Sequence, residues 1–185
     1  MNAPRTVRFH EVMKGRIAAA TAPGNDTGIA STVLEADVAI DDLDAFLVDP
    51  NRRARLSGEV RIEGKGTFPA EGKVELFVVG DRPGHRLMRY EATFTIASSQ
   101  HRLVGTKHVG RASGVFVWRD VTTLYTTIWR LDAPAVATAA GVLKLSLWQG
   151  IRLLLSLRGS GIGAILRFAR FFLAESLAAA VGWPR

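Results

Sequence analysis

The chain has 185 residues, of which 48% are apolar and 22% charged, and it contains no cysteine. This balance is typical of a globular protein, and the length suits one domain. The missing thiols exclude disulfides, zinc-thiolate sites, iron–sulfur clusters and thiol catalysis. We therefore expect a fold held together by its apolar core.

Positive charge is concentrated near the C-terminus. The net charge is +7, but residues 1–132 carry 18 basic and 16 acidic side chains. Residues 133–185 carry six basic side chains, and Glu175 is their one acid. This part of the chain is also the most apolar. Cationic and apolar character together favour an anionic membrane surface as partner, and not nucleic acid.

The first 147 residues show mostly the period of two that is typical of half-buried strands. In residues 55–63, Leu56, Val60 and Ile62 share one face, and charged or small residues occupy the other. Such runs at short spacing predict an antiparallel lipocalin-like β-barrel, with a β-sandwich as the alternative. The predicted strands are 7–19, 31–40, 55–63, 73–79, 87–97, 102–109, 119–131 and 135–147.

One short helix is predicted at residues 42–48, within a barrel domain that spans residues 1–147. Its apolar residues recur at helical spacing, Asp41 is the predicted N-cap, and Pro50 ends it. It connects two strands, either packed on the core or as a mobile lid at one end of the barrel.

Residues 148–185 are predicted to form a basic amphipathic helical tail. Helices at 148–158 and 162–181 are separated by Gly159-Ser160-Gly161. Phe171 and Glu175 lie opposite the broad apolar face of the second helix, which consists of Ile162, Ile165, Leu166, Ala169, Phe172, Leu173, Leu177 and Ala180.

The apolar face of this tail packs either on a membrane or on the barrel. The arginines favour the membrane, because each basic side chain near an anionic leaflet strengthens binding. A tryptophan near the end of the chain suits the membrane interface. The predicted membrane-binding residues are Arg152, Arg158, Arg167, Arg170, Phe172 and Trp183.

The sequence holds no apolar run long enough to cross a bilayer and no apolar N-terminal stretch of signal-peptide length. We therefore expect a cytoplasmic protein that is peripheral to the membrane.

Several polar side chains lie on strand faces that are otherwise apolar. If these faces point inward, the barrel holds an apolar chamber with a few hydrogen-bonding groups, as ligand pockets do. If they point outward, they are ordinary solvent-exposed positions. A buried lysine needs a partner, for which Asp120 and Glu91 are the candidates. The predicted ligand-binding residues are Tyr90, Lys107, Asp120, Tyr125 and Trp129.

Other motifs do not predict a site. The run Gly159–Ala164 matches a relaxed dinucleotide-binding pattern, but it lacks the preceding strand and the following βαβ unit. The four histidines show no H-x-x-x-H spacing. We expect neither a metal nor a cofactor.

Five segments between residues 7 and 175 together resemble an accessory β-rich domain of GMC-type, cholesterol-oxidase-like flavoproteins and lipid-active hydrolases. The segments are Phe9-x-Glu11-x-Met13-x-Gly15, Ile40-Asp-Asp-Leu-Asp-Ala-Phe-Leu-Val-Asp-Pro50, Met88-Arg89-Tyr90, Gly105-Thr-Lys107 and Trp118-Arg-Asp-Val-Thr-Thr-Leu-Tyr125. The resemblance implies a function connected with lipids or sterols. The chain lacks a flavin-binding or hydrolase part, so the resemblance does not imply catalysis.

From the residues and the resemblance together we expect a protein that binds a lipid-like or sterol-like molecule at a membrane surface, as carrier or accessory protein. One alternative is an enzyme of apolar substrates in which Lys107, Tyr90 and Asp120 act as acid and base. Another is an accessory module that docks onto a lipid-active oxidoreductase or hydrolase.

Overall fold

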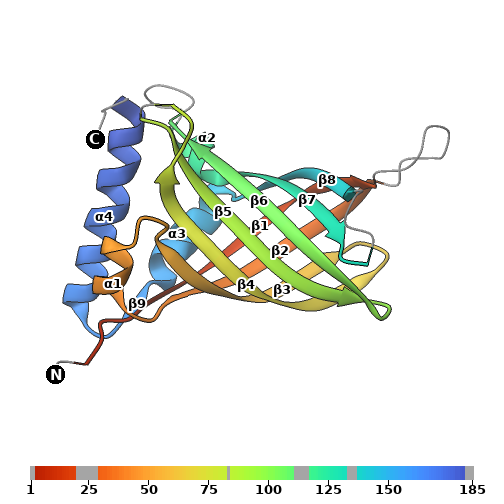
Figure 1. Cartoon of the computed structure of the whole chain (residues 1–185), viewed down its shortest axis with the longest axis horizontal. Helices are drawn as coiled ribbons and strands as arrows, with labels where there is room; N and C mark the ends of the chain where they lie inside the picture. The colour runs from red at the N-terminus through yellow and green to blue at the C-terminus, as the bar shows by residue number, and fades with distance from the viewer. Residues whose placement is uncertain (1–2, 20–28, 83, 111–116, 133–136, 182–185) are drawn as a thin grey trace.

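The computed structural model describes residues 3–19, 29–82, 84–110, 117–132 and 137–181. Within them, eight antiparallel strands close into a barrel (Figure 1), which confirms the predicted lipocalin-like β-barrel. Strand β1 closes it by pairing with both β2 and β8. The strands are β1 (Val7–Ala19), β2 (Ile29–Ile40), β3 (Arg53–Ile62), β4 (Gly66–Val79), β5 (Arg86–Ile96), β6 (Ser99–Val109), β7 (Thr123–Arg130) and β8 (Ala137–Lys144).

Alternation along the strands fills the barrel with apolar side chains. On β1, Val7, Phe9 and Met13 are buried, whereas Arg8 and Lys14 are exposed. Every strand from β1 to β8 contributes buried apolar side chains to one continuous core. The removal of this apolar surface from water drives folding.

Two glycines permit close approach of neighbouring strands as the sheet curves. A Cβ at Gly15 would lie 1.9 Å from the carbonyl oxygen of Val142 on β8. A Cβ at Gly72 would lie 1.9 Å from the carbonyl oxygen of Glu91 on β5. A glycine inside a strand is typical of such bends.

Two predicted strands differ from those observed. Strand β4 begins at Gly66, seven residues before the predicted start, although it contains Pro69. This part of β4 pairs with β3 only, because the pairing with β5 begins at Glu71. The predicted strand 119–131 is instead helix α2 (Val117–Thr122) followed by β7. Six residues are too few to establish a helical period.

Helix α1 (Leu43–Val48) lies between β2 and β3, as predicted. Its N-cap is Asp42 and not Asp41: the Asp42 carboxylate accepts from the backbone N–H groups of Asp44 and Ala45 at 2.9 and 3.0 Å. Asp42 directly precedes the first helical residue and has the extended backbone that a cap requires. Asp41 pairs with Arg55 on β3 instead.

The C-terminal part consists of α3 (Leu147–Ser156), β9 (Arg158–Gly159) and α4 (Ile162–Val181). The short strand β9 pairs with Val7 and Arg8 at the beginning of β1. Helix α4 therefore starts beside the N-terminal end of β1 and stands across one end of the barrel, next to α1 (Figure 1). A search of the described residues finds no helix that is both long and apolar enough to cross a bilayer.

Candidate functional site

Three polar side chains meet inside the barrel, and we call them the interior cluster: Glu11 on β1, Tyr90 on β5 and Lys107 on β6. Each occupies an inward position in the alternation of its strand, and each is 2% exposed. Burial of a charged pair costs free energy that apolar side chains of the same size would not cost. Such a cluster in an otherwise apolar core is a candidate functional site.

The interior cluster is held together by hydrogen bonds. The Lys107 ammonium donates to Glu11 Oε2 at 3.0 Å and to the Tyr90 hydroxyl oxygen at 2.9 Å. The ammonium also lies 4.7 Å from the centroid of the Tyr90 ring. Burial raises the pKa of Tyr90 well above its usual value, and the charge of Glu11 and a hydrogen bond with it add to the effect. Tyr90 is therefore a neutral phenol beside an ion pair.

Small residues lie opposite Tyr90 and Glu11 on the neighbouring strands. Tyr90 pairs with Gly105 on β6, and Glu11 pairs with Ala36 on β2. One step further along β5, Ala92 pairs with Gly72. The side chain of Leu124 on β7 fills the space beside Gly105, where a Cβ would lie 2.8 Å from it.

One oxygen of the interior cluster has no hydrogen-bond partner among the described residues. Lys107 binds Oε2 of Glu11, whereas Oε1 is buried and unpartnered. Most buried polar side-chain atoms in proteins have a partner, so an unpartnered carboxylate oxygen requires an explanation. It can accept a hydrogen bond from a molecule that enters the barrel.

The structure places Tyr90 and Lys107 inside the barrel, which is one of the two directions that the sequence left open. The candidate partners of Lys107 are wrong, because its partner is Glu11. Glu91 lies on the outer face of β5, where it pairs with Lys73 and Arg102. The actual partner, Glu11, is absent from the predicted site. The alternation on β1 could have identified it, because Glu11 shares a face with Phe9 and Met13.

The prediction that Tyr125 and Trp129 line the interior is wrong. The inward residues of β7 are Leu124, Thr126 and Ile128, which are buried, so the odd-numbered positions point outward. Tyr125 is 47% exposed, and Trp129 is half-buried on the same outer face. Threonine and aromatic residues are common on an outer strand face, and the sequence of β7 does not distinguish its two sides.

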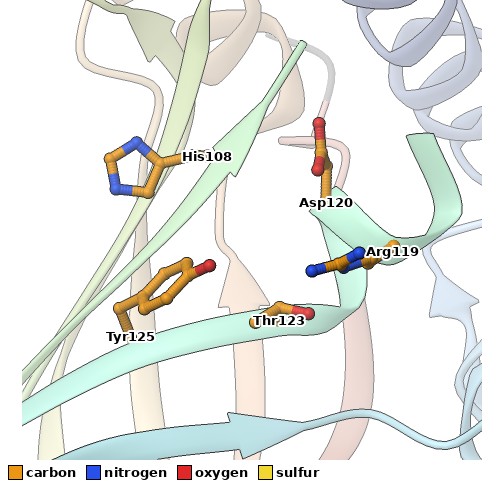
Figure 2. Close-up of a pocket in the computed structure, with 5 residues that line it drawn as sticks. All are labelled: His108, Arg119, Asp120, Thr123 and Tyr125. Carbon is orange, nitrogen blue, oxygen red and sulfur yellow. The ribbon is translucent and has the colours of Figure 1, made fainter. Parts of the chain in front are cut away.

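Asp120 and Tyr125 meet instead at a shallow groove outside the barrel. Figure 2 shows His108 of β6 facing Tyr125, with the α2 residues Arg119 and Asp120 and the β7 residue Thr123 on the other side. The groove has a volume of about 20 Å³, which holds about one water molecule. Lys107, Tyr90 and Asp120 therefore do not form a single acid–base site.

Histidines extend from this groove along the barrel wall. His108 Nδ1 lies 3.3 Å from His85 Nε2, and the two rings stack at 5.4 Å. His85 Nδ1 lies 2.7 Å from Asp81, and this hydrogen bond lowers the pKa of the Asp81 carboxyl. These contacts hold the turn between β4 and β5 against β6.

Helix α4 packs on the barrel with the side that lies opposite its predicted apolar face. Phe168 stacks on Phe9 of β1 at 5.7 Å. Phe171 meets the rings of Phe46 and Phe77 edge-on at 5.7 and 5.8 Å. Aromatic rings bury large areas and prefer such offset or edge-on contacts, so the phenylalanines decide which side of α4 faces the barrel.

Glu175 fastens the other half of α4 to the barrel. Its carboxylate is 3% exposed and accepts from Arg52 at one oxygen and from Arg86 at the other, both at 3.1 Å. Arg52 also donates to the carbonyl oxygen of Phe77 at 3.0 Å. Arg52 and Phe77 both have left-handed backbones, with φ of 46° and 52°, a conformation that costs free energy outside glycine and that packing must compensate.

The predicted membrane-binding residues differ in their surroundings. The side chains of Arg152, Arg158 and Arg170 are exposed. Arg167 is also exposed but forms an ion pair with Asp44 of α1. The remaining two are different: Phe172 packs edge-on against Phe77, and Trp183 lies outside the described residues.

The fold and the interior cluster define a closed, lipocalin-like β-barrel with a buried ion pair inside it and a helix across one end. Comparison with family models, with curated proteins and with solved structures finds no match to this chain.

Proposed function

We propose that this protein binds lipid at an anionic membrane surface, where it acts as an accessory protein and docks through the outer side of α4. The observation that carries the proposal is that α4 is apolar on two opposite sides. One side packs on the barrel through its phenylalanines. The other consists of Ile162, Leu166, Leu173 and Leu177, which are 78%, 62%, 62% and 63% exposed.

These four aliphatic residues form a stripe along one side of the helix, with Arg170 within it. Water-exposed aliphatic side chains at this spacing do not contribute to the core, because the opposite side of α4 already fills the barrel end. A contiguous exposed apolar patch on a folded protein is typical of an interaction surface. Helix α3, which packs on β1, carries two further exposed apolar residues, Trp148 and Leu155, which are 67% and 71% exposed.

The charge around this stripe favours an anionic membrane as its occupant. The exposed charged residues of α3, β9 and α4 are Arg152, Arg158, Arg167 and Arg170. Glu175, the one acid of this part of the chain, faces the barrel and is paired with two arginines. Arg170 lies beside the aliphatic residues of the stripe, and such aliphatic and cationic groups match the acyl and phosphate layers of an anionic leaflet.

The interior of the closed barrel is filled with side chains, which favours an accessory protein over a carrier. Apolar side chains of all eight strands occupy the barrel, whereas a carrier needs a chamber of roughly 300–1,000 Å³. The interior cluster is the observation that favours a carrier function in a second, opened form of the barrel.

Vesicle sedimentation tests the membrane proposal. The full chain should sediment with vesicles that contain phosphatidylglycerol and remain in solution with phosphatidylcholine alone. Leu166→Glu with Leu173→Glu should lower the partition coefficient by about a hundredfold, because two aliphatic side chains no longer enter the interface and two acids oppose the lipid charge. Arg170→Glu should lower it by about tenfold and weaken its salt dependence.

Two controls match these variants at the opposite end of the barrel. Ile29→Glu changes an aliphatic residue that is 53% exposed, and Lys65→Glu makes the same charge change as Arg170→Glu. Both should sediment like the unmodified protein. Equal losses in the controls, or a stripe that instead holds a dimer in sedimentation velocity without lipid, would contradict the proposal.

A further inference from the structure

The unpartnered carboxylate oxygen in the barrel indicates what a ligand there must offer. Glu11 Oε1 is buried and accepts no hydrogen bond from the described residues. The other groups of the interior cluster contact one another: the Lys107 ammonium donates to Glu11 Oε2 and to the Tyr90 hydroxyl oxygen. The one atom of the cluster that the described residues leave without any partner is therefore an acceptor.

We propose that the interior cluster binds the hydroxyl group of an apolar alcohol, with Glu11 Oε1 as the acceptor. This inference rests on the proposed lipid-binding function and specifies the chemistry of the ligand. A hydroxyl donates the hydrogen bond that the carboxylate lacks, and a bond to a charged group is stronger than one between neutral groups. A ketone or an ester offers only acceptors and leaves Oε1 unpartnered.

The charge of the interior cluster selects against fatty acids. Lys107 and Glu11 neutralise each other at 3.0 Å, so the pair offers no net positive charge to a carboxylate. An ionised acid in the barrel would place a second negative charge beside Glu11 in a medium of low dielectric constant, where like charges repel strongly. A neutral alcohol carries no such cost.

The ligand's apolar body reaches the interior cluster from the α4 end of the barrel. Phe9 lies one inward position from Glu11 along β1, and Phe168 of α4 stacks on Phe9. Phe168 thus occupies the place against Phe9, the inward neighbour of Glu11, that an apolar chain would take. Displacement of α4 opens this place. The outer stripe allows α4 to bind the membrane when the helix leaves the barrel.

A pair of matched probes tests the selectivity in solution, without vesicles. A dodecanol and a dodecanoic acid, each with the same environment-sensitive fluorophore at the far end, differ only in the group that reaches the cluster. The alcohol should bind the full chain about tenfold more tightly than the acid at pH 8, the difference that one hydrogen bond to a charged group provides.

The matched variant is Glu11→Gln with Lys107→Met, which removes both charges together and leaves no unpaired ion in the core. It should fold and lose the preference for the alcohol, because the charge that repels the acid and the charged acceptor that binds the alcohol are removed together. Thr126→Val, which alters another buried polar residue on the inner face, should keep the preference. Phe168→Ala should speed association of the alcohol.

The results distinguish this inference from the membrane proposal. Equal affinity for both probes, or an alcohol preference that survives in the double variant, overturns the inference, and a lone buried water would then be the partner of Glu11. Vesicle binding of the double variant should remain unchanged, because the stripe on α4 is untouched. Loss of vesicle binding in the stripe variants with intact probe selectivity would confirm that the two sites are separate.

Discussion

Two buried carboxylates of this barrel differ in how completely they are partnered. Glu175 at the barrel end has one arginine on each oxygen. Glu11 inside the barrel has Lys107 on one oxygen and no described partner on the other. A fully satisfied buried carboxylate stabilises the contact in which it lies, whereas a partly satisfied one costs free energy. We therefore interpret Glu175 as a structural contact that holds α4 on the barrel, and Glu11 as part of a candidate binding site.

The largest loss of stability should follow from removing the ion pairs of Glu175. Glu175→Gln leaves Arg86, which is 8% exposed, without its counter-charge, and breaking a buried pair in this way costs about 3 kcal/mol. Denaturant unfolding of the full chain should show this loss in the free energy of unfolding. Asp41→Asn, which breaks the exposed pair with Arg55, should change it by no more than about 0.5 kcal/mol.

A double-mutant cycle addresses the other carboxylate. Glu11→Gln and Lys107→Met should each destabilise the barrel by about 2 kcal/mol, because each leaves one buried polar partner unpaired. The double variant should lie within about 1 kcal/mol of the unmodified protein, which gives a coupling energy of about 3 kcal/mol. Additive losses would mean that the pair does not interact as the 3.0 Å distance indicates.

The pH dependence of stability should be smaller and confined to alkaline solution. The pKa of Tyr90 is raised in the folded protein, so above about pH 10 the unfolded chain loses the phenolic proton and the folded chain keeps it. The contribution of Tyr90 to the free energy of unfolding should therefore be fully present below about pH 10, and it should be lost as the pH rises beyond this value. Tyr90→Phe should flatten this fall.

Phenolate absorbance provides the direct measurement. The chain has two tyrosines, so Tyr125→Phe leaves Tyr90 as the only phenol. In this background the absorbance of phenolate should appear together with the loss of the β signal in circular dichroism. Ionisation in the folded barrel, before that loss, would contradict the burial of Tyr90.

The outline of the fold could be predicted from local pattern. Alternation identified the strands of the barrel, and helical spacing gave α4 with the observed limits, residues 162–181. Each of these features depends on residues close together in the sequence, where the period of two or of 3.6 is decisive. The apolar neighbours of Tyr90 and Lys107 on the same strand faces left both directions open, and the structure places both side chains inside the barrel.

The candidate site could be predicted only in part. Glu11 and Lys107 are separated by 96 positions, and no local pattern indicates which inward acid meets which inward lysine. On β7 both faces carry residues that suit an interior, so only closure of the barrel shows that Tyr125 points outward. For the same reason Asp120 was placed with Lys107, whereas α2 holds it at the outer groove.

The amino-acid sequence by itself determined the class of fold, the position of α4 and the basic, apolar character of the C-terminal part, because composition and periodicity fix how a segment buries its apolar side chains. Only the tertiary structure decided which side of α4 faces the barrel. Hydrophobic spacing favoured the side with Ile162 and Leu166, but the aromatic rings of Phe168 and Phe171 find partners on β1, α1 and β4, and Glu175 finds two arginines. Those partners come from distant parts of the chain, so the choice is made when the barrel closes.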